Sequence, residues 1–217
     1  MDIIPSILVD NPQELLSQLQ AATGIVSQVQ VDIADGCFVS SLTPNDPELI
    51  SQVSGLDIEL HLMVANPMAE ISRWTGVRAI KRILFHYESA PGQIISVCQA
   101  IIDSGRQAGL VINPNTDWHQ TIPFLPKIQS LMFMGVYPGK QGQGLIPEVL
   151  SAITECRQEF PDLYLELDGG VNLNTLPQII PTRVSAICPG SAIFKQPKTP
   201  AECVAEMQQI IRSLTSK

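Results

Sequence analysis

The stretch Gln30-Val31-Asp32-Ile33-Ala34-Asp35-Gly36 determines how the rest of the chain is interpreted. It closes an apolar run, residues 24–31, with two carboxylates and a glycine. A run that ends abruptly in acidic and turn-forming residues is typical of a buried strand that presents functional side chains at its carboxyl end. The segment therefore predicts a core strand with Asp32 at its end.

The same pattern recurs three times further along the chain. It is found in Ile58-Glu59-Leu60-His61, in residues 163–170 and in residues 185–191. Several strands of one chain are therefore expected to point polar groups at one common place.

The composition limits the possible partners. The chain has 217 residues, of which 45% are hydrophobic and 16% charged, as in a soluble α/β protein. The formal net charge of −8 argues against nucleic acid or an anionic membrane as a partner, and no apolar run reaches the roughly 20 residues of a membrane span. An anionic small molecule remains compatible, because backbone amides and helix N-termini bind phosphate without a basic surface.

The cysteines indicate a reducing compartment. They are five in number, scattered, and form no Cys-x-x-Cys pair. With no signal sequence before the first predicted strand, we expect reduced thiols in a cytoplasmic protein.

Strands and helices alternate along the chain. Strands are predicted at 3–8, up to 32, 57–63, 80–86, 108–112, 128–136, up to 168 and 184–188, and helices at 12–22, 47–53, 67–76, 91–104, from 116, 147–160, 174–180 and 200–214. Eight strand–helix units without a linker predict a parallel sheet and match a single-domain (β/α)8 TIM barrel over residues 1–217. A doubly wound sheet is the alternative, but it would usually carry phosphate-binding glycines in the first strand–helix turn, where this chain has Pro5-Ser6.

Two acids and a histidine are the leading candidates for chemistry. Asp32 and Asp168 each end an apolar run, where burial of a lone carboxylate is costly. Either one alone could simply cap the following turn. Together with His61 on a third strand they indicate a metal or acid/base site, because the carboxyl ends of barrel strands converge on one face. Two carboxylates on different strands can also reach opposite faces of a substrate, as inversion of a carbon acid requires.

Three late loops are rich in glycine. Gly139 to Gly142, Gly169-Gly170 and Gly190-Ser191 each follow a predicted strand, the sixth, seventh and eighth, and precede a helix. Such loops direct backbone N–H groups toward an anion, and barrels commonly bind phosphate after strands seven and eight. One such pair would indicate only a turn, whereas three in succession favour a phosphate site.

Six motifs in order between residues 3 and 194 resemble the ribulose-phosphate 3-epimerase family. They are Ile4-Pro5-Ser6-Ile7-Leu8, Val31-Asp32-Ile33-Ala34-Asp35-Gly36-x-Phe38-Val39, His61-Leu62-Met63-Val64-x-Asn66-Pro67, Tyr137-Pro138-Gly139-x-x-Gly142-Gln143, Glu166-Leu167-Asp168-Gly169-Gly170-Val171-Asn172 and Gly190-Ser191-Ala192-Ile193-Phe194. The resemblance implies a (β/α)8 barrel that interconverts D-ribulose 5-phosphate and D-xylulose 5-phosphate at C3. It also makes a homo-oligomer plausible.

The resemblance implies a role for each matching residue. Asp32 and Asp168 match the acid/base pair, and with His61 they match ligands of a divalent metal, often zinc, that stabilises a cis-enediolate. The remaining matches surround the substrate: Ser6, His61, Met63 and Met134 near the sugar, and Gly139, Gly142, Gly169, Gly170, Gly190 and Ser191 around the phosphate.

The chain departs from the family pattern at Gln30. A second metal-binding histidine is expected there, and a glutamine oxygen is a poorer zinc ligand than imidazole. The resemblance therefore leaves three outcomes open: the metal is held weakly, exchanged for another ion among Zn, Mn, Fe and Co, or lost. Lys140 adds a cation near the expected phosphate, unless it is only a solvated loop lysine. For His86, at the end of the fourth predicted strand, we expect a hydrogen-bonded structural role.

Other functions stay open beside the pentulose-phosphate epimerase. One is an epimerase of another ketose phosphate, such as a hexulose 6-phosphate, and a second is a non-catalytic sugar-phosphate binder, which the loss of the histidine at Gln30 would suit. A decarboxylase or aldolase relative is a weaker hypothesis. Such barrels typically show Asp-x-Lys-x-x-Asp, and no lysine accompanies Asp32-Ile33-Ala34-Asp35.

Overall fold

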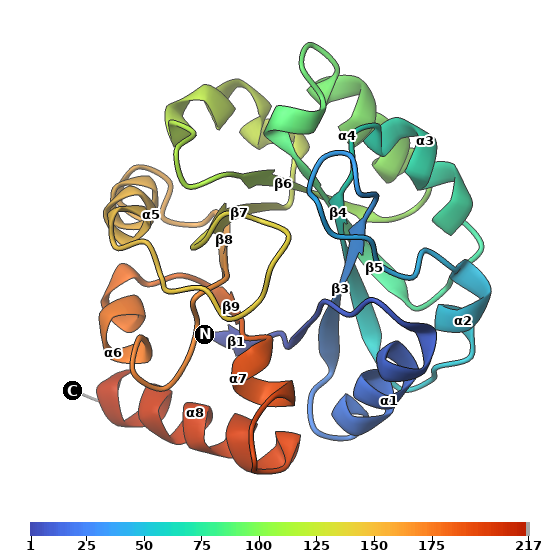
Figure 1. The fold of residues 1–217 in the computed structure, drawn as a ribbon. Coiled ribbons are helices and arrows are strands. Elements are labelled where there is room, and N and C mark those ends of the chain that lie inside the picture. Colours follow the sequence, from blue (N-terminus) through green and yellow to red (C-terminus); the bar gives the residue numbers. More distant parts are fainter. Residues whose placement is uncertain (216–217) are drawn as a thin grey trace.

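A computed structural model describes residues 1–215 of the chain. Its strands form one parallel sheet that curls around a central axis, with the helices outside (Figure 1). The strands, in sheet order, are β1 (Asp2–Ile3), β9 (Ala186–Cys188), β8 (Tyr164–Asp168), β7 (Ser130–Met134), β6 (Gln107–Ile112), β5 (Ile80–His86), β4 (Asp57–Met63), β3 (Gln28–Ala34) and β2 (Ser6–Ile7). The predicted α/β architecture is confirmed.

The two shortest strands are halves of the first predicted strand, and they close the barrel. β1 pairs with β9, and β2 pairs with β3. Between them the backbone N–H of Ile4 donates to Ile187, while the carbonyl of Pro5 accepts from Gln30 at 2.9 Å. Proline has no N–H to give to the ladder, which explains the interruption. Residues 2–7 thus bond to both neighbours and make an eight-stranded (β/α)8 barrel of nine strand segments.

The helices cover the outside of the sheet. They are α1 (Pro12–Ala22), α2 (Pro47–Ser51), α3 (Pro67–Ile71), α4 (Ile94–Asp103), α5 (Glu148–Glu159), α6 (Leu176–Ile179), α7 (Ser191–Phe194) and α8 (Pro200–Thr215). Asn11, Asp46 and Asn66 cap α1, α2 and α3 through side-chain oxygens, each with proline at the next position. Within residues 1–215, every helix is too short or too polar to span a bilayer.

Three predicted helices differ in detail from the observed ones. The helix expected at 67–76 is α3 followed by a 3-10 turn, Ser72–Trp74. The helix expected from residue 116 is a 3-10 helix, Trp118–Lys127, because Pro123 and Pro126 lie inside it and prevent continuous α-helical hydrogen bonding. The helix expected at 174–180 is shortened to α6 and a 3-10 turn, Ile180–Thr182, that includes Pro181. The sequence prediction also omitted α7, a single turn.

Side-chain alternation separates two cores. Val29, Val31 and Ile33 of β3 join the large core between sheet and helices, whereas Gln30 and Asp32 face the other way, into the barrel. A second, smaller apolar cluster lies inside the barrel. Its members are Ile4, Leu84, Val111, Met132, Met134, Ala186 and Cys188. The barrel interior is therefore a mixture of apolar and polar layers.

One interior layer contains three ionisable side chains. The Arg82 guanidinium Nη1 lies 2.6 Å from Glu59 Oε2 and 3.0 Å from Glu166 Oε1, and both glutamates are fully buried. Burial, and then the charge of Glu166, raise the pKa of Glu59 well above its usual range. Two carboxylates facing one guanidinium therefore hold a proton more strongly than an isolated glutamate does.

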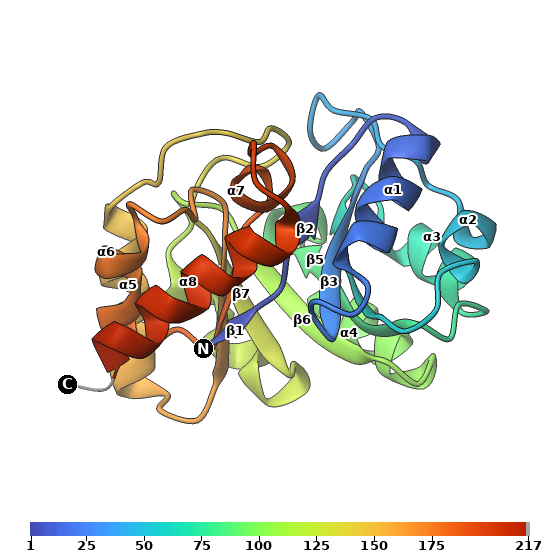
Figure 2. The same ribbon diagram turned by 90° about the horizontal axis from the view of Figure 1, so that it is seen from below.

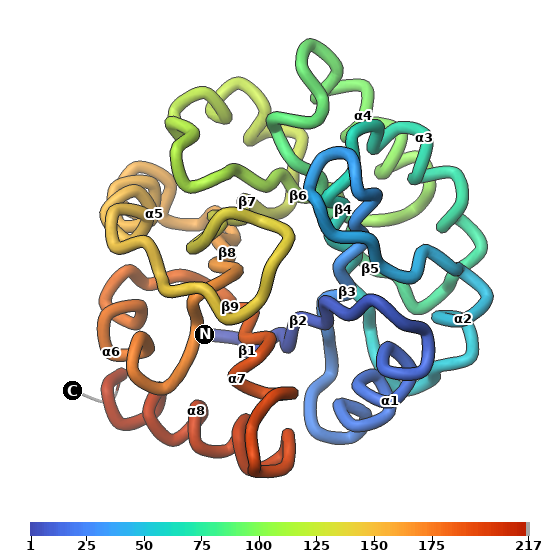
Figure 3. The backbone as a smooth tube through the Cα atoms, viewed as in Figure 1, coloured from blue at the N-terminus to red at the C-terminus, as the bar shows by residue number. Residues whose placement is uncertain are grey.

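The loops after β3 and β7 and helix α7 lie at one end of the barrel, opposite the N-terminus (Figure 2). The tube trace shows the loop between β7 and α5, in yellow, crossing the barrel mouth (Figure 3). It meets the loop after β3, because the Ser41 hydroxyl donates to the carbonyl of Gly139. Two loops from opposite sides of the barrel thus meet above the carboxyl ends of the strands.

Replacing Glu59 with Gln should stabilise the protein increasingly as pH rises. A carboxyl whose pKa is raised by folding loses stability as pH rises from its unfolded pKa toward its folded pKa, and Glu59→Gln removes that loss. We therefore expect Glu59→Gln to raise the free energy of unfolding, relative to the wild type, more at pH 8 than at pH 4.

Urea unfolding at both pH values measures this difference. Glu159→Gln, which removes an exposed carboxylate of α5, is the matched control and should change little at either pH. A change in the free energy of unfolding that is the same at pH 4 and pH 8 would contradict the raised pKa of Glu59.

Candidate active site

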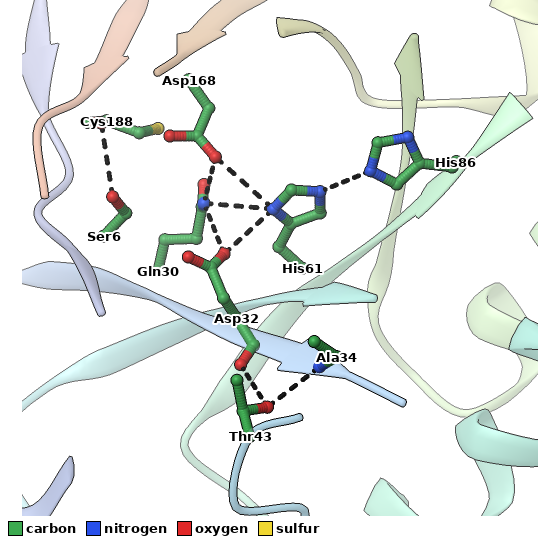
Figure 4. A network of polar contacts seen from close by, with 9 residues as sticks. All are labelled: Ser6, Gln30, Asp32, Ala34, Thr43, His61, His86, Asp168 and Cys188. Carbon is green, nitrogen blue, oxygen red and sulfur yellow. Dashed lines mark hydrogen bonds and ion pairs between the residues drawn. The ribbon is translucent and has the colours of Figure 1, made fainter. Parts of the chain in front are cut away.

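Four polar side chains from three strands meet inside the barrel (Figure 4). Gln30 and Asp32 come from β3, His61 from β4 and Asp168 from β8. Asp32 and His61 are direct register partners. His61 Nδ1 lies 3.0 Å from Asp32 Oδ1 and 3.5 Å from Asp168 Oδ2. The structure therefore brings together the three residues that the sequence indicated.

Gln30 lies at the centre of this group. Its Nε2 donates to Asp32 Oδ1 and to Asp168 Oδ2, each at 2.8 Å, and lies 3.3 Å from His61 Nδ1. Its Oε1 is buried without a hydrogen-bond partner among residues 1–215. The N–H groups of the Gln30 amide thus reduce the repulsion between the two carboxylates, while its Oε1 accepts no hydrogen bond.

The two carboxylates favour a cation between them. Burial alone would lower the pKa of His61, but its hydrogen bonds to Asp168 and Asp32 and their negative charges raise it to about 10. Burial and the charge of Asp168 raise the pKa of Asp32, against the hydrogen bonds from His61 and Gln30. At neutral pH His61 therefore carries a second ring proton, held in place by the acids.

The same donor atoms fit a divalent metal ion. One ligand atom each from Asp32, His61 and Asp168 lies within 4.8 Å of the others. Two carboxylates and an imidazole suit Zn²⁺, Mn²⁺, Fe²⁺ or Co²⁺. The unpartnered Gln30 Oε1 would gain a partner as a further ligand if the amide turned over. The arrangement therefore accepts either a proton on His61 or a metal ion.

A cavity of about 260 Å³ opens next to the two acids. Asp32 and Asp168 line it together with the other residues expected around the substrate: Ser6, Met63, Met134, Gly139, Gly142, Gly169, Gly170, Gly190 and Ser191. His61 and Gln30 are not among its lining residues in the described part of the chain; both are completely buried beneath the acids. His61 therefore contacts the two acids but is not exposed to the cavity.

Glycine is required at two positions in the wall of this cavity. Gly170 has φ +71°, and a Cβ there would lie 2.6 Å from the Cα of Leu145. A Cβ on Gly190 would lie 2.8 Å from Gln141 Nε2 and 2.9 Å from the Ser6 hydroxyl oxygen. A side chain at either position would collide with these neighbours, so the glycines allow Leu145, Gln141 and Ser6 to pack directly against the backbone of the cavity wall.

Further polar groups line the same wall. They are Lys140, Gln141, Gln143, Asn172 and Gln196. Lys140 is exposed there, as a cation at the mouth of the cavity. Sequence reasoning missed Gln141 and Gln196, because isolated glutamines in loops carry no pattern that marks a site.

Thr43 anchors the strand that carries Asp32. Its hydroxyl donates to the carbonyl of Asp32 and accepts from the N–H of Ala34, both at 2.9 Å (Figure 4). The contact ties the loop after β3 to the end of that strand. Sequence reasoning missed Thr43 as well.

His86 lies behind His61. The two Nε2 atoms are 2.9 Å apart, and both rings are fully buried. Burial lowers the pKa of His86 to about 4, so its ring is neutral at pH 7. The hydrogen bond expected for His86 is therefore made, and its partner is His61.

The sequence of the chain matches one known protein family. The model of the ribulose-phosphate 3 epimerase family matches residues 2–194. Ribulose-phosphate 3-epimerase from Mycobacterium bovis is 32% identical over 216 residues, 95% of this chain and 91% of the relative. The Synechocystis enzyme of the same name is 31% identical over 211 residues, 94% of this chain and 91% of the relative.

Solved structures support the fold alone. 3-Hexulose-6-phosphate synthase from Salmonella typhimurium has a TM-score of 0.75 at 12% identity, covering 99% of this chain and all 100% of its own. KGPDC from Streptococcus mutans, solved in complex with D-R5P, has a TM-score of 0.74 at 14% identity, covering 98% of both chains.

The matched relatives are named as carbohydrate epimerases, and the match extends over most of their length and most of this chain. By its sequence and its barrel, the chain belongs to the ribulose-phosphate 3-epimerase family of isomerases.

Proposed function

We propose that the chain interconverts D-ribulose 5-phosphate and D-xylulose 5-phosphate at C3 by proton transfer between two aspartates. The observation that supports this reaction is that Asp32 and Asp168, from opposite parts of the sequence, line one cavity. The glycine loops expected to hold a phosphate line the same cavity. Substrate and acid/base groups would therefore share one small space.

Each aspartate would serve one face of the reacting carbon. One carboxylate removes the C3 proton, and the other, protonated, returns a proton to the opposite face, which inverts the centre. In the reverse direction the two exchange roles. Met63 and Met134 would form apolar walls that exclude water, and Ser6 would contact the sugar. The backbone around Gly170 and Gly190 would orient the phosphate end.

Asp32, His61 and Asp168 would hold a divalent metal, with Gln30 Oε1 as a candidate fourth ligand. When bound, such an ion supplies positive charge next to the oxygens of the enediolate formed by proton removal. The side chains of the protein keep one of the two carboxylates deprotonated and the other protonated at each stage, and hold His61 between them.

A second candidate function is a non-catalytic sugar-phosphate binder. The observation that favours it concerns Gln30, whose Nε2 donates to both carboxylates. In this way the amide makes the interaction with the two acids that a bound metal ion would otherwise make. We further propose a cytoplasmic homo-oligomer. The free state of all five cysteines suits a reducing compartment.

Asp32→Asn and Asp168→Asn should each abolish epimerisation. Each removes one of two required proton carriers, so we expect a loss of at least about 100-fold in kcat, the lower range for general acid–base catalysis. Conversion of ribulose 5-phosphate to xylulose 5-phosphate, measured with added Zn²⁺, Mn²⁺, Fe²⁺ or Co²⁺, tests this.

Asp103→Asn on the exposed side of α4 is the matched control and should leave turnover unchanged. A wild-type protein that turns over neither sugar with any of these metals, yet binds phosphate esters tightly, would establish the binder instead.

Gln30→His should tighten metal binding. Imidazole is a better ligand for Zn²⁺ than an amide oxygen, and the substitution also removes the Nε2 donor that pairs with both acids. We expect the Kd for Zn²⁺, measured by competition calorimetry, to fall at least about tenfold.

Gln99→His, on the exposed side of α4, controls for adventitious binding by an added imidazole. An unchanged or weakened Zn²⁺ affinity in Gln30→His would show that residue 30 does not face the ion.

A further inference from the structure

Lys140 is the only lysine or arginine among the described residues that line the cavity beside the two acids. The other acidic or basic side chains in that wall are Asp32 and Asp168. A phosphate monoester carries a charge of about −1.5 to −2 at pH 7. The two acids and the net charge of −8 of the chain therefore repel such a group, and Lys140 is the side chain in the wall that opposes this repulsion.

The backbone of Lys140 is held on two sides. The Ser41 hydroxyl donates to the carbonyl of the preceding residue, Gly139. Gln143 Nε2 donates to the carbonyl of Lys140 at 2.9 Å and to that of Tyr137 at 2.7 Å. The loop that carries Lys140 is thus fixed both to the loop after β3 and to itself, so the lysine starts from a defined point of the cavity wall.

This point lies near the glycine loop that follows β9. Gln141, the next residue, has its Nε2 within 2.8 Å of the position that a Cβ on Gly190 would take. Lys140 also borders a second cavity, of about 460 Å³, and the two catalytic candidates are not among the described residues that line it. Lys140 is therefore placed beside the loop expected to hold phosphate, on the side away from the acids.

The ammonium group of Lys140 has no competing partner in the protein. The residue is exposed, and the ion pairs formed within residues 1–215 do not include it. Asp10 and Glu14 border the second cavity, but Asn11 Nδ2 donates to both of them, at 3.4 Å and 3.2 Å. A bound anion would therefore not have to displace a protein carboxylate from this lysine.

We propose that Lys140 is a substrate-binding residue that pairs with the phosphate group and makes the site select phosphorylated sugars. The inference rests on the proposed function and adds a side-chain cation to a phosphate site otherwise expected to consist of backbone. The phosphate keeps its charge while C3 reacts, so Lys140 would stabilise the bound substrate and the transition state equally. Such a contact lowers KM and leaves kcat unchanged.

Three variants separate the local charge of Lys140 from the overall charge of the protein. Lys140→Met removes the ammonium group and keeps a long, flexible side chain, whereas Lys140→Arg keeps the charge. Lys195→Met removes the same charge from an exposed residue that borders the second cavity and is not among those lining the first. It is therefore the matched control.

Binding of inorganic phosphate measures the interaction without turnover. An NMR titration that follows the backbone N–H signals of Gly190 and Ser191 gives the Kd and reports whether phosphate binds beside that loop. We expect Lys140→Met to raise this Kd about five- to tenfold, between the effects of an exposed ion pair and of a hydrogen bond to a charged group. Lys140→Arg should retain most of the affinity, and Lys195→Met should match the wild type. With D-ribulose 5-phosphate, Lys140→Met should raise KM by a similar factor at unchanged kcat.

The outcomes distinguish this proposal from the proposed function. A phosphate Kd in Lys140→Met equal to that of the wild type would overturn it, and so would an equal rise in Lys195→Met, which would show that only net charge matters. A lower kcat at unchanged KM in Lys140→Met would also overturn it. Absence of turnover in the wild type and every variant would count against the epimerase reaction alone, because the phosphate titration does not depend on turnover.

Discussion

The hydrogen-bond register of a closed parallel barrel is the constraint on which the site depends. It sets Asp32 opposite His61, and Asp168 opposite both Met134 and Cys188. Because side chains alternate along a strand, a shift of one residue would turn Asp32 out of the barrel toward the helices. Closure through residues 2–7 keeps the first and last strands in this register.

Charge inside the barrel is the second consequence of that register. One interior layer holds Glu59 and Glu166 around Arg82, and another holds Asp32 and Asp168 around His61. In each layer two carboxylates surround one cationic group, so both layers favour retention of a proton. The layer with the aspartates reaches the cavity beside Asp32 and Asp168, and Glu59, Arg82 and Glu166 are not among the described residues that line it. The first layer is therefore interpreted as structural and the second as chemical.

Sequence reasoning predicted the barrel and the meeting of Asp32, His61 and Asp168, because strand periodicity and strand ends are local features. It could not predict contacts that depend on loop paths. Glu88 reaches His86 from a 3-10 turn after β5, and Thr43 reaches the end of β3 from a loop. The sequence indicated Gln30 only as a position where a metal-binding histidine is replaced. It could not predict that the Gln30 side chain donates to both acids, because the direction of that side chain depends on all three strands.

The central claim is that two carboxylates act on opposite faces of one carbon. The most direct test is the reaction in D₂O, followed by NMR at C3 during the first few per cent of conversion. The account predicts that the product epimer carries solvent deuterium at C3 while recovered substrate keeps its hydrogen, because one acid removes the proton and the other supplies a different one. Product that retains the original C3 hydrogen would contradict the account.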